Sequence, residues 1–480
     1  MSKKSITKNY IYNVMYQLLI IILPIITTPY LSRILGAENI GIYSYTLSIV
    51  TYFILFGSLG IAMYAQREIA YVQDDKEKRS KIFWEIIILR IITMSISMVI
   101  FYLTYINGTE YTMYYKILLL EMVSTCFDIS WFFQGLEDFK KTVLRNVIIR
   151  IISILLIFIL IKSPNDLVLY FVIYVSSNLI GNLSLWLYLP KYLKKVKKLN
   201  IIQHIKPTIG LFIPQIAMQI YTVLDKVMIG SIVPDKSEVG YYDQSQKIIK
   251  LLLTIVTSLG TVMIPRMAKT FAEHDKNKIK EYLQRAFNFV FFLAIPMMFG
   301  VISIAEKFVP IFFGDGYGRV IELMQVISPI FIAIGLSNVI GSQYLLPTKR
   351  QKEFTISVTI GAFVNIVMNL ILIRKMGAKG ASIATVIAEF SVTLVQFYFV
   401  RKDINLLKIL KMAIPYIFMS IIMFIVCALI DKFVIVNALV NVVMQIIIGA
   451  SIYFFGLYII KDEFYLYILA KVRNILKLTK

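Results

Sequence analysis

The chain has 480 residues, of which 58% are hydrophobic and only 16% are charged, and its mean hydropathy is +0.76. Soluble domains contain about 45–50% apolar residues, so this composition excludes a soluble globular protein and indicates a membrane protein. The formal net charge is +22. A charge of that size in a soluble chain would indicate a nucleic-acid partner, but its distribution along this chain has another explanation.

Apolar segments long enough to cross a bilayer follow one another with short polar connections. A spanning helix needs about 20 mostly apolar residues. Such segments cover residues 10–31, 42–64, 82–104, 114–134, 143–162, 167–189, 208–230, 244–264, 284–304, 320–345 (broken), 354–374, 380–400, 411–430 and 436–460. The first contains Pro24 and Pro29, which predict an interruption, and it lacks a small-residue cleavage site, so we expect an uncleaved helix. The sequence therefore predicts an all-α polytopic membrane protein of about fourteen transmembrane helices.

The connections between these segments differ in charge from one side of the membrane to the other. Most of the 50 lysine and arginine residues fall on the side that holds the N-terminus, from Lys3, Lys4 and Lys8 to the C-terminal tail. The positive-inside rule then places both termini in the cytoplasm and requires an even number of helices. Membrane topology thus explains the net charge, and no nucleic-acid partner is expected.

Cysteine and histidine give no sign of a disulfide or a metal site. Cys126 and Cys427 both fall inside apolar segments, which favours small core residues over a disulfide. His204 and His274 lie in polar connections without metal-ligand spacing around them. We therefore expect no cofactor and no metal.

The chain repeats itself at an offset of about six helices. Residues 58–63, SLGIAM, recur as residues 258–263, SLGTVM, and Gly41 corresponds to Gly240. Because six is even, the two copies have the same orientation, which predicts parallel repeats related by an axis along the membrane normal. The expected parts are an N-lobe at 1–205, a C-lobe at 206–405, and two further helices with a cytoplasmic tail at 406–480.

Several stretches resemble the Wzx-type polysaccharide flippases of the multidrug/oligosaccharidyl-lipid/polysaccharide exporter superfamily. The most specific is residues 27–43, TTPYLSRILGAENIGIY. Further similar stretches are residues 64–70, YAQREIA; 131–140, WFFQGLEDFK; 224–230, LDKVMIG; and 377–385, GAKGASIAT. The resemblance implies two six-helix lobes facing a central cavity, with two additional C-terminal helices. It also implies a substrate, an undecaprenyl-pyrophosphate oligosaccharide, flipped for capsule or other surface polysaccharide assembly.

Charged residues at membrane depth are the candidate site, because burying a charge in a bilayer is costly without a function. Arg33 and Lys226 occupy repeat-related positions near the outer ends of their helices, where two facing cations suit a pyrophosphate; the alternative is snorkelling at a helix end. Lys247 and Lys250 share one helical face and are either cavity cations or interfacial lysines.

The remaining candidates have open roles. Arg90 and Arg150 either line the cavity or pair with a carboxylate. Glu121 and Asp128 are seven residues apart, which predicts one helical face and either coupling to a proton or Na⁺ or a static ion pair. Asp225 and Glu389 lie within spans and either orient a lysine of the other lobe or pair locally.

The expected mechanism is alternating access, driven by the membrane potential acting on an anionic substrate. Alternatives are a lipid II (peptidoglycan precursor) flippase and a cation-coupled multidrug exporter. A membrane glycan polymerase is less favoured, since the short outer loops contain no histidine, and no nucleotide-binding glycine loop is present. Expected partners are the lipid-linked oligosaccharide, membrane lipids, and a polysaccharide polymerase with other assembly proteins.

Overall fold

Long helices make up almost the whole chain. The computed structural model describes the backbone of residues 6–478, and the side chains in that range except those of 6–21, 213–222, 261, 262, 276, 472 and 475–478. Lys3, Lys4 and the side chains of Lys8 and Pro214 thus lie outside the described residues. Helix accounts for 86% of the chain, and the described part contains no strand. The predicted all-α membrane class is confirmed.

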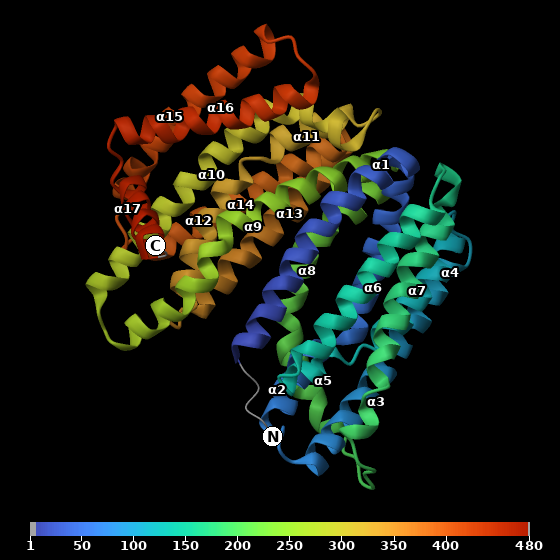
Figure 1. The fold of residues 1–480 in the computed structure, drawn as a ribbon. Coiled ribbons are helices and arrows are strands. Elements are labelled where there is room, and N and C mark those ends of the chain that lie inside the picture. The colour runs from blue at the N-terminus through green and yellow to red at the C-terminus, as the bar shows by residue number, and fades with distance from the viewer. Residues whose placement is uncertain (1–5, 479–480) are drawn as a thin grey trace. The chain divides into compact units, whose positions relative to one another are not determined.

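The chain divides into two units, residues 1–240 and residues 241–480, and the boundary falls inside helix α9 (Ser237–Ala272). The predicted lobe boundaries at 205 and 405 stay predictions. The first unit contains α1 (Ile6–Ser58), α2 (Ile61–Tyr71), α3 (Lys76–Phe101), α4 (Thr112–Cys126), α5 (Ser130–Gly135), α6 (Phe139–Leu160), α7 (Leu167–Trp186) and α8 (Ile205–Ile232) (Figure 1). The second contains α10 (Lys276–Phe313), α11 (Gly318–Ile327), α12 (Ile330–Ser337), α13 (Gln351–Met376), α14 (Ala378–Val400), α15 (Leu406–Phe433), α16 (Ala438–Ile459) and α17 (Glu463–Leu478).

Twelve helical stretches among the described residues are long and apolar enough to span a bilayer. The predicted segments 10–31 and 42–64 both overlap the single stretch Ile22–Tyr71. The predicted segment 208–230 coincides with α8, which contains the undescribed side chains 213–222. The chain therefore crosses the membrane many times, and the number fourteen remains a prediction.

The first interruption of α1 lies at Gly36, not at its prolines. Gly36 has φ 77° and ψ 169°, a conformation open only to glycine, whereas the helix continues through Pro24 and Pro29. The predicted interruption at the prolines is thus wrong, because a proline removes one helical hydrogen bond and membrane helices tolerate that loss. A second turn, at Leu59 (φ 43°) and Gly60 (φ 70°), leads into α2.

Two other predicted segments are divided. Segment 114–134 consists of α4 and α5, separated by residues 127–129. Segment 320–345, predicted to be broken, consists of α11, α12 and a π-helical stretch, Asn338–Leu345. Irregular backbone inside a membrane protein requires polar partners from its surroundings, so the break after α4 marks a place where side chains must supply hydrogen bonds.

Each unit has its own aromatic core. In the first, Phe83 of α3 lies 5.5 Å from Trp131 and 5.1 Å from Phe132 of α5 between ring centroids. In the second, the carbonyl of Phe292 in α10 accepts a hydrogen bond from the Tyr453 hydroxyl of α16 at 2.9 Å. These cores hold α2, α3 and α5 together in one unit, and α10, α15 and α16 in the other.

The repeat-related glycines meet inside the first unit. A Cβ atom on Gly41 would lie 1.8 Å from the carbonyl oxygen of Lys236 and 3.1 Å from the amide nitrogen of Gly240. A Cβ on Gly240 would lie 2.1 Å from the carbonyl oxygen of Ala37. The second part of α1 and the start of α9 therefore pack backbone to backbone at corresponding positions of the two repeats.

Candidate functional site

Of the four predicted cations on the first unit, three are exposed or half-buried. Arg33 precedes the Gly36 break and is exposed, as is Arg150 on α6. Lys226 on α8 is half-buried, and its neighbour Asp225 is 4% exposed and interacts electrostatically with Tyr52 of α1. Arg33 and Arg150 are thus the most exposed of these cations within the unit.

A cluster of tyrosines lies within electrostatic range of Arg150. The ring of Tyr43 in α1 lies 4.8 Å from that of Tyr170 and 5.7 Å from that of Tyr174 in α7. All three are half-buried, and Arg150 interacts electrostatically with Tyr174. Aromatic faces combined with hydroxyl groups can contact both the apolar and the polar sides of a sugar ring.

The buried carboxylate of Glu121 lies beside this cluster. Asn178 Nδ2 donates to both Glu121 carboxylate oxygens, at 3.0 and 3.1 Å. Asn178 is half-buried in α7, one helical turn beyond Tyr174. The tyrosine cluster consists of Tyr43, Tyr170, Tyr174, Glu121 and Asn178.

Asp128 does not share a helical face with Glu121. Helix α4 ends at Cys126, and the Asp128 carboxylate accepts hydrogen bonds from the amide and hydroxyl of Ser130, at 2.9 and 2.5 Å. The expected shared face is thus wrong, because the spacing argument requires an unbroken helix. Asp128 thus accepts the first amide of α5, one residue before the N-cap residue Ile129, while ion coupling at either carboxylate stays a prediction.

Arg90 stabilises the break between α4 and α5. Its guanidinium is 3% exposed and donates to the Asp128 carbonyl at 2.7 Å, and Trp186 Nε1 donates to the Phe127 carbonyl at 2.8 Å. Both carbonyls belong to the non-helical residues and would otherwise lack partners inside the span. This contact is with a backbone carbonyl, so both roles expected for Arg90, lining the cavity and pairing with a carboxylate, stay predictions.

Arg145, at the start of the predicted segment 143–162, extends the same polar network. It donates to Ser130 Oγ and to Asn182 Oδ1, both at 2.7 Å, and Asn182 Nδ2 donates to the Ser124 carbonyl at 2.9 Å. The four-residue spacing of Asn178 and Asn182 within an apolar segment was the available signal, since it places two amides on one helical face.

In the second unit, Lys247 pairs with a carboxylate that the sequence analysis missed. Lys247 Nζ lies 2.7 Å from Asp243 Oδ2, and the Asp243 side chain is 4% exposed. Residues 243–246, DQSQ, are all buried. The predicted span began at residue 244 and so assigned Asp243 to a loop, although its spacing from Lys247 is that of a helical ion pair.

The other candidates of this unit are on α9 and α14. Lys250 is exposed, and Glu389 is buried. The hydroxyl of Tyr242 lies 3.1 Å from Thr385 Oγ1 and accepts a hydrogen bond from Gln246 Nε2 at 2.9 Å. A buried polar strip thus connects α9 with α14, and the roles predicted for Lys250 and Glu389 stay predictions.

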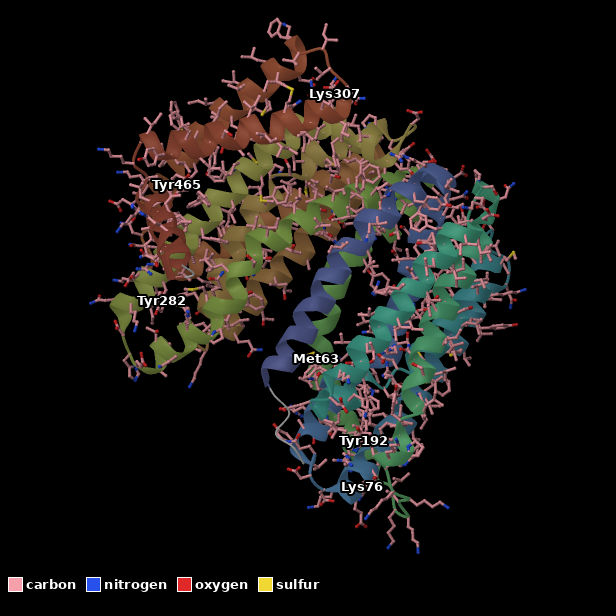
Figure 2. All side chains as sticks on the ribbon, viewed as in Figure 1. Met63, Lys76, Tyr192, Tyr282, Lys307 and Tyr465 are labelled. Atoms are coloured by element: carbon pink, nitrogen blue, oxygen red, sulfur yellow. The ribbon has the colours of Figure 1, made fainter. Side chains whose placement is uncertain are left out.

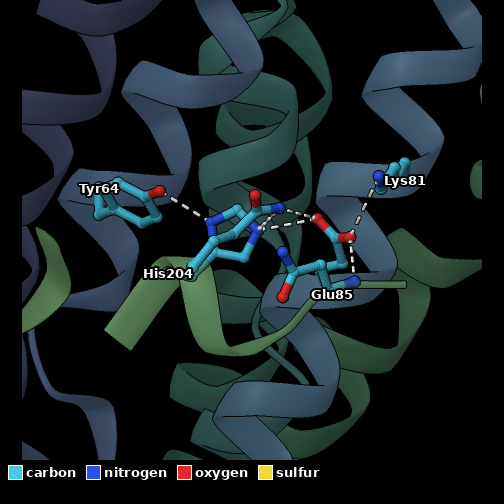
Figure 3. Close-up of polar contacts among 6 residues, drawn as sticks. Tyr64, Lys81, Glu85 and His204 are labelled. Carbon is cyan, nitrogen blue, oxygen red and sulfur yellow. Dashed lines mark hydrogen bonds and ion pairs between the residues drawn. The ribbon is translucent and has the colours of Figure 1, made fainter. Parts of the chain in front are cut away.

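The linker between the predicted lobes is tied to α3 by a buried hydrogen bond between His204 and Glu85 (Figure 3). Glu85 is fully buried, and His204 Nε2 lies 2.9 Å from Glu85 Oε2. A proton on Nε2 faces the carboxylate and leaves His204 Nδ1 to accept the Tyr64 hydroxyl, 2.7 Å away. Asn200 N and Gln203 Nε2 also donate to Glu85, at 2.5 and 2.9 Å.

More of the linker is fixed nearby, at the end of the first unit where Figure 2 labels Lys76 and Tyr192. Lys76 Nζ donates to the Lys191 carbonyl at 3.0 Å, and the Arg79 guanidinium donates to the Tyr192 carbonyl at 2.8 Å. The linker therefore covers the first turns of α3.

The described residues contain no group of three or more potential metal ligands among His, Cys, Asp and Glu. Cys126 and Cys427 are free and buried, which confirms their assignment as core residues.

Comparison with known proteins places the chain among transporters. The family model "Polysaccharide biosynthesis protein" matches residues 6–271, and the model "Lipid II flippase MurJ" matches residues 188–449. A protein of Escherichia coli (strain K12) named "Putative O-antigen transporter" is 26% identical over 411 residues, 84% of this chain and 98% of that protein. The "Lipid II flippase MurJ" of Bacillus subtilis (strain 168) is 25% identical over 162 residues, 33% of this chain and 29% of that protein.

Solved structures share the fold. The structure titled "Lipid II flippase MurJ, inward closed conformation" has a TM-score of 0.74 and 19% identity, covering 95% of this chain and 99% of that one. An inward-facing multidrug resistance MATE family transporter has a TM-score of 0.64 and 14% identity, covering 81% of this chain and 94% of that one. The chain belongs to the polysaccharide biosynthesis protein family as a Wzx-type flippase of the multidrug/oligosaccharidyl-lipid/polysaccharide exporter superfamily, and is a transporter rather than an enzyme.

Proposed function

We propose that the protein flips an undecaprenyl-pyrophosphate-linked oligosaccharide from the cytoplasmic to the outer leaflet of the plasma membrane, for capsule or other surface polysaccharide assembly. The observation that carries this proposal is the similarity to the Escherichia coli protein, which extends over 98% of that protein's length. Lipid-linked sugars then require a polysaccharide polymerase and other assembly proteins as downstream partners.

The candidate residues suit different chemical parts of the substrate. A pyrophosphate offers charge-assisted hydrogen-bond acceptors that suit Arg33 and Arg150, both exposed on the first unit. Lys226, Lys247 and Lys250 are the further proposed cations. The tyrosine cluster suits a sugar, since it presents half-buried aromatic rings beside a carboxylate and an amide. Arg90 acts indirectly, by holding the break that positions α5.

The driving force in this proposal is the membrane potential combined with alternating access. One charge crossing 100 mV gains or loses about 2.3 kcal/mol. With the cytoplasm negative, export of an anionic headgroup is favourable, and an emptied cationic site is drawn back toward the cytoplasm. The potential then drives both halves of the cycle.

The test is transport in proteoliposomes under a clamped potential, with a fluorescent undecaprenyl-pyrophosphate oligosaccharide. We expect the rate to rise with an export-favouring potential, and the R33Q and R150Q variants to lose about tenfold or more in rate. K116Q, which changes an exposed cation of α4, is the matched control and keeps the wild-type rate. Dependence on a pH or Na⁺ gradient alone, with indifference to voltage, overturns the voltage-driven mechanism.

Lipid II is the second candidate substrate. It is favoured by the MurJ family match over residues 188–449. A strain depleted of its own lipid II flippase separates the two substrates: rescue by this protein supports lipid II. Accumulation of a different lipid-linked sugar on the inner leaflet, when this protein is removed from its own cell, supports the oligosaccharide.

A further inference from the structure

Helices α3 and α10 begin at corresponding positions of the two repeats. The Asp75 side chain accepts the Lys78 amide at 3.0 Å, and the Asp275 side chain accepts the Lys278 amide at 3.0 Å. These N-caps have the same spacing as the SLGIAM and SLGTVM repeats. The first turns of α3 and α10 are therefore equivalent, residue by residue, in the two repeats.

In the first unit, the α7–α8 linker covers the first turns of α3. Ser80 Oγ accepts the Lys194 amide at 2.9 Å, and Glu85 binds the linker through His204. The second unit has Lys280 and Arg285 at these positions. Arg285 pairs with Glu281 at 2.5 Å and donates to the Tyr467 hydroxyl of α17 at 3.2 Å, while Lys280 lines an open cavity.

This cavity, of about 530 Å³, lies between the first turns of α10, the end of α14 and the start of α15. Its cations are Lys280, Arg401, Lys402 and Lys408, and none of the four forms an ion pair within the part of the chain that the structure describes. A second cavity, of about 330 Å³, shares Lys280 and Lys402 with it. The α14–α15 connection thus presents concentrated positive charge without matching anions.

The one acidic residue in the cavity lining already has a partner outside the four cations. Asp403 Oδ2 lies 2.6 Å from Arg350 Nη1. Burial lowers the pKa of Arg350, but hydrogen bonds to Glu353 and Asp403 outweigh this effect and raise its pKa overall. Asp403 is therefore held by Arg350, which it shares with Glu353, and this single carboxylate balances at most one of the four cations.

A cavity at the corresponding end of the first unit differs in its charge balance. It measures about 620 Å³ and is lined by five lysines together with Asp75 and Glu77. Lys78 Nζ lies 3.4 Å from Asp75 Oδ2, and Lys81 Nζ lies 3.9 Å from Glu85 Oε1. Basic residues at a membrane surface are expected from topology alone. Two of the five lysines of this cavity are paired with carboxylates, whereas none of the four cations of the second-unit cavity is paired within the described part of the chain.

An exposed apolar strip begins in the wall of the cavity. Leu407 in the first turn of α15 lines the cavity and is 71% exposed. Leu410 and Ile414, on the following turns, are also exposed. A cationic pocket continuous with an apolar helix surface matches a molecule with an anionic head and hydrocarbon tails, and matches inorganic phosphate less well.

We propose that this cavity binds the phosphate group of an anionic phospholipid, with the acyl chains lying along α15. Lys280, Arg401, Lys402 and Lys408 contact the phosphate oxygens, and Leu407, Leu410 and Ile414 contact the hydrocarbon. The site is separate from the proposed transport cations and does not depend on which lipid-linked sugar is transported.

The experiment uses the purified full-length protein in a neutral detergent. Phosphatidylglycerol, phosphatidylcholine and inorganic phosphate are added separately, and binding is followed by the shift in thermal unfolding and by native mass spectrometry. The test variant is K280Q/R401Q/K402Q/K408Q. The matched control is K78Q/K195Q/K197Q/K198Q, which removes as many charges from the cavity of the first unit.

We expect phosphatidylglycerol alone to stabilise the protein, with the test variant needing at least about tenfold more of it and the control less than about twofold more. A third variant, K280R/K402R/K408R, keeps the positive charges and is expected to bind as tightly as the wild type. Its binding shows that a loss in the test variant comes from the lost charges and not from misfolding. Equal losses in test and control variants, an unchanged affinity in the test variant, failure of the arginine variant, or equal stabilisation by inorganic phosphate would each overturn the proposal.

Discussion

At the residue scale, buried charges in this protein are held by several partners at once. The Glu85 carboxylate receives hydrogen bonds from a backbone amide, an amide side chain and the His204 ring. Such a group stabilises the fold modestly when all partners are present, but removing it leaves the others buried and unsatisfied. Its loss therefore affects the whole linker.

We expect Glu85→Ala to lower the free energy of unfolding by about 3–5 kcal/mol, because it leaves His204, Gln203 and the Asn200 amide without their acceptor. Thermal unfolding of the purified protein measures this effect. The control is Glu68→Ala, which removes an exposed pair with Arg67 and should change stability by less than about 1 kcal/mol. Similar stabilities for the two variants would contradict the structural role of Glu85.

The sequence reveals which charges lie within apolar segments but not their partners. Arg90 was identified in this way, whereas its acceptor is a backbone carbonyl exposed by a helix break. His204 pairs with a residue more than a hundred positions away, a contact that only tertiary packing determines. Asp243 and Arg145 were missed because hydropathy placed them at segment edges, where charge is ordinary.

At the element scale, helix packing depends on places where two backbones touch. The second part of α1 meets the start of α9 at Gly41 and Gly240, which leave no room for a Cβ atom. Glycine pairs of this kind bring membrane helices into close contact and gain van der Waals packing. The contact joins corresponding positions of the two repeats.

We expect Gly41→Ala and Gly240→Ala each to reduce transport and to lower the unfolding temperature, because each added methyl would overlap a carbonyl oxygen. Gly300→Ala in α10 is the control, since nothing lies within 4 Å of its Cβ position. It should stabilise the protein by about 0.5–1 kcal/mol through its higher helix propensity. Equal tolerance of all three substitutions would contradict the close contact.

Apolar periodicity predicted most elements, and the errors have physical causes. The break after α4 contains no proline or glycine, only Phe127, Asp128 and Ile129. It is stabilised by donors from α3 and α7, which local sequence does not reveal. Conversely, Pro24 and Pro29 carry a strong breaking signal that the helix tolerates.

At the scale of the whole molecule, the distribution of lysine and arginine determines the proposed orientation. The loops on the N-terminal side contain most of the basic residues, so the α7–α8 linker and both termini are expected in the cytoplasm. This orientation also places the phosphate site of the second unit in the inner leaflet, where anionic lipids give a negative surface potential.

Single-cysteine labelling tests the orientation in intact cells. We expect Lys197→Cys, in the α7–α8 linker, to be protected from a membrane-impermeant maleimide, and Gly108→Cys, before α4, to be labelled. The background is low because Cys126 and Cys427 are buried. Permeabilised cells, in which both positions react, provide the control, and the reverse pattern in intact cells would invert the proposed direction of transport.

The position of the unit boundary within α9 has a consequence for biosynthesis. A fragment that ends at residue 205 lacks α8, which packs against α1, and also lacks Gly240. A fragment that ends at residue 240 retains these contacts but cuts a continuous helix in its first turns. Synthesis must therefore reach residue 240, inside α9, before the contacts of α1 with α8 and with Gly240 can all form.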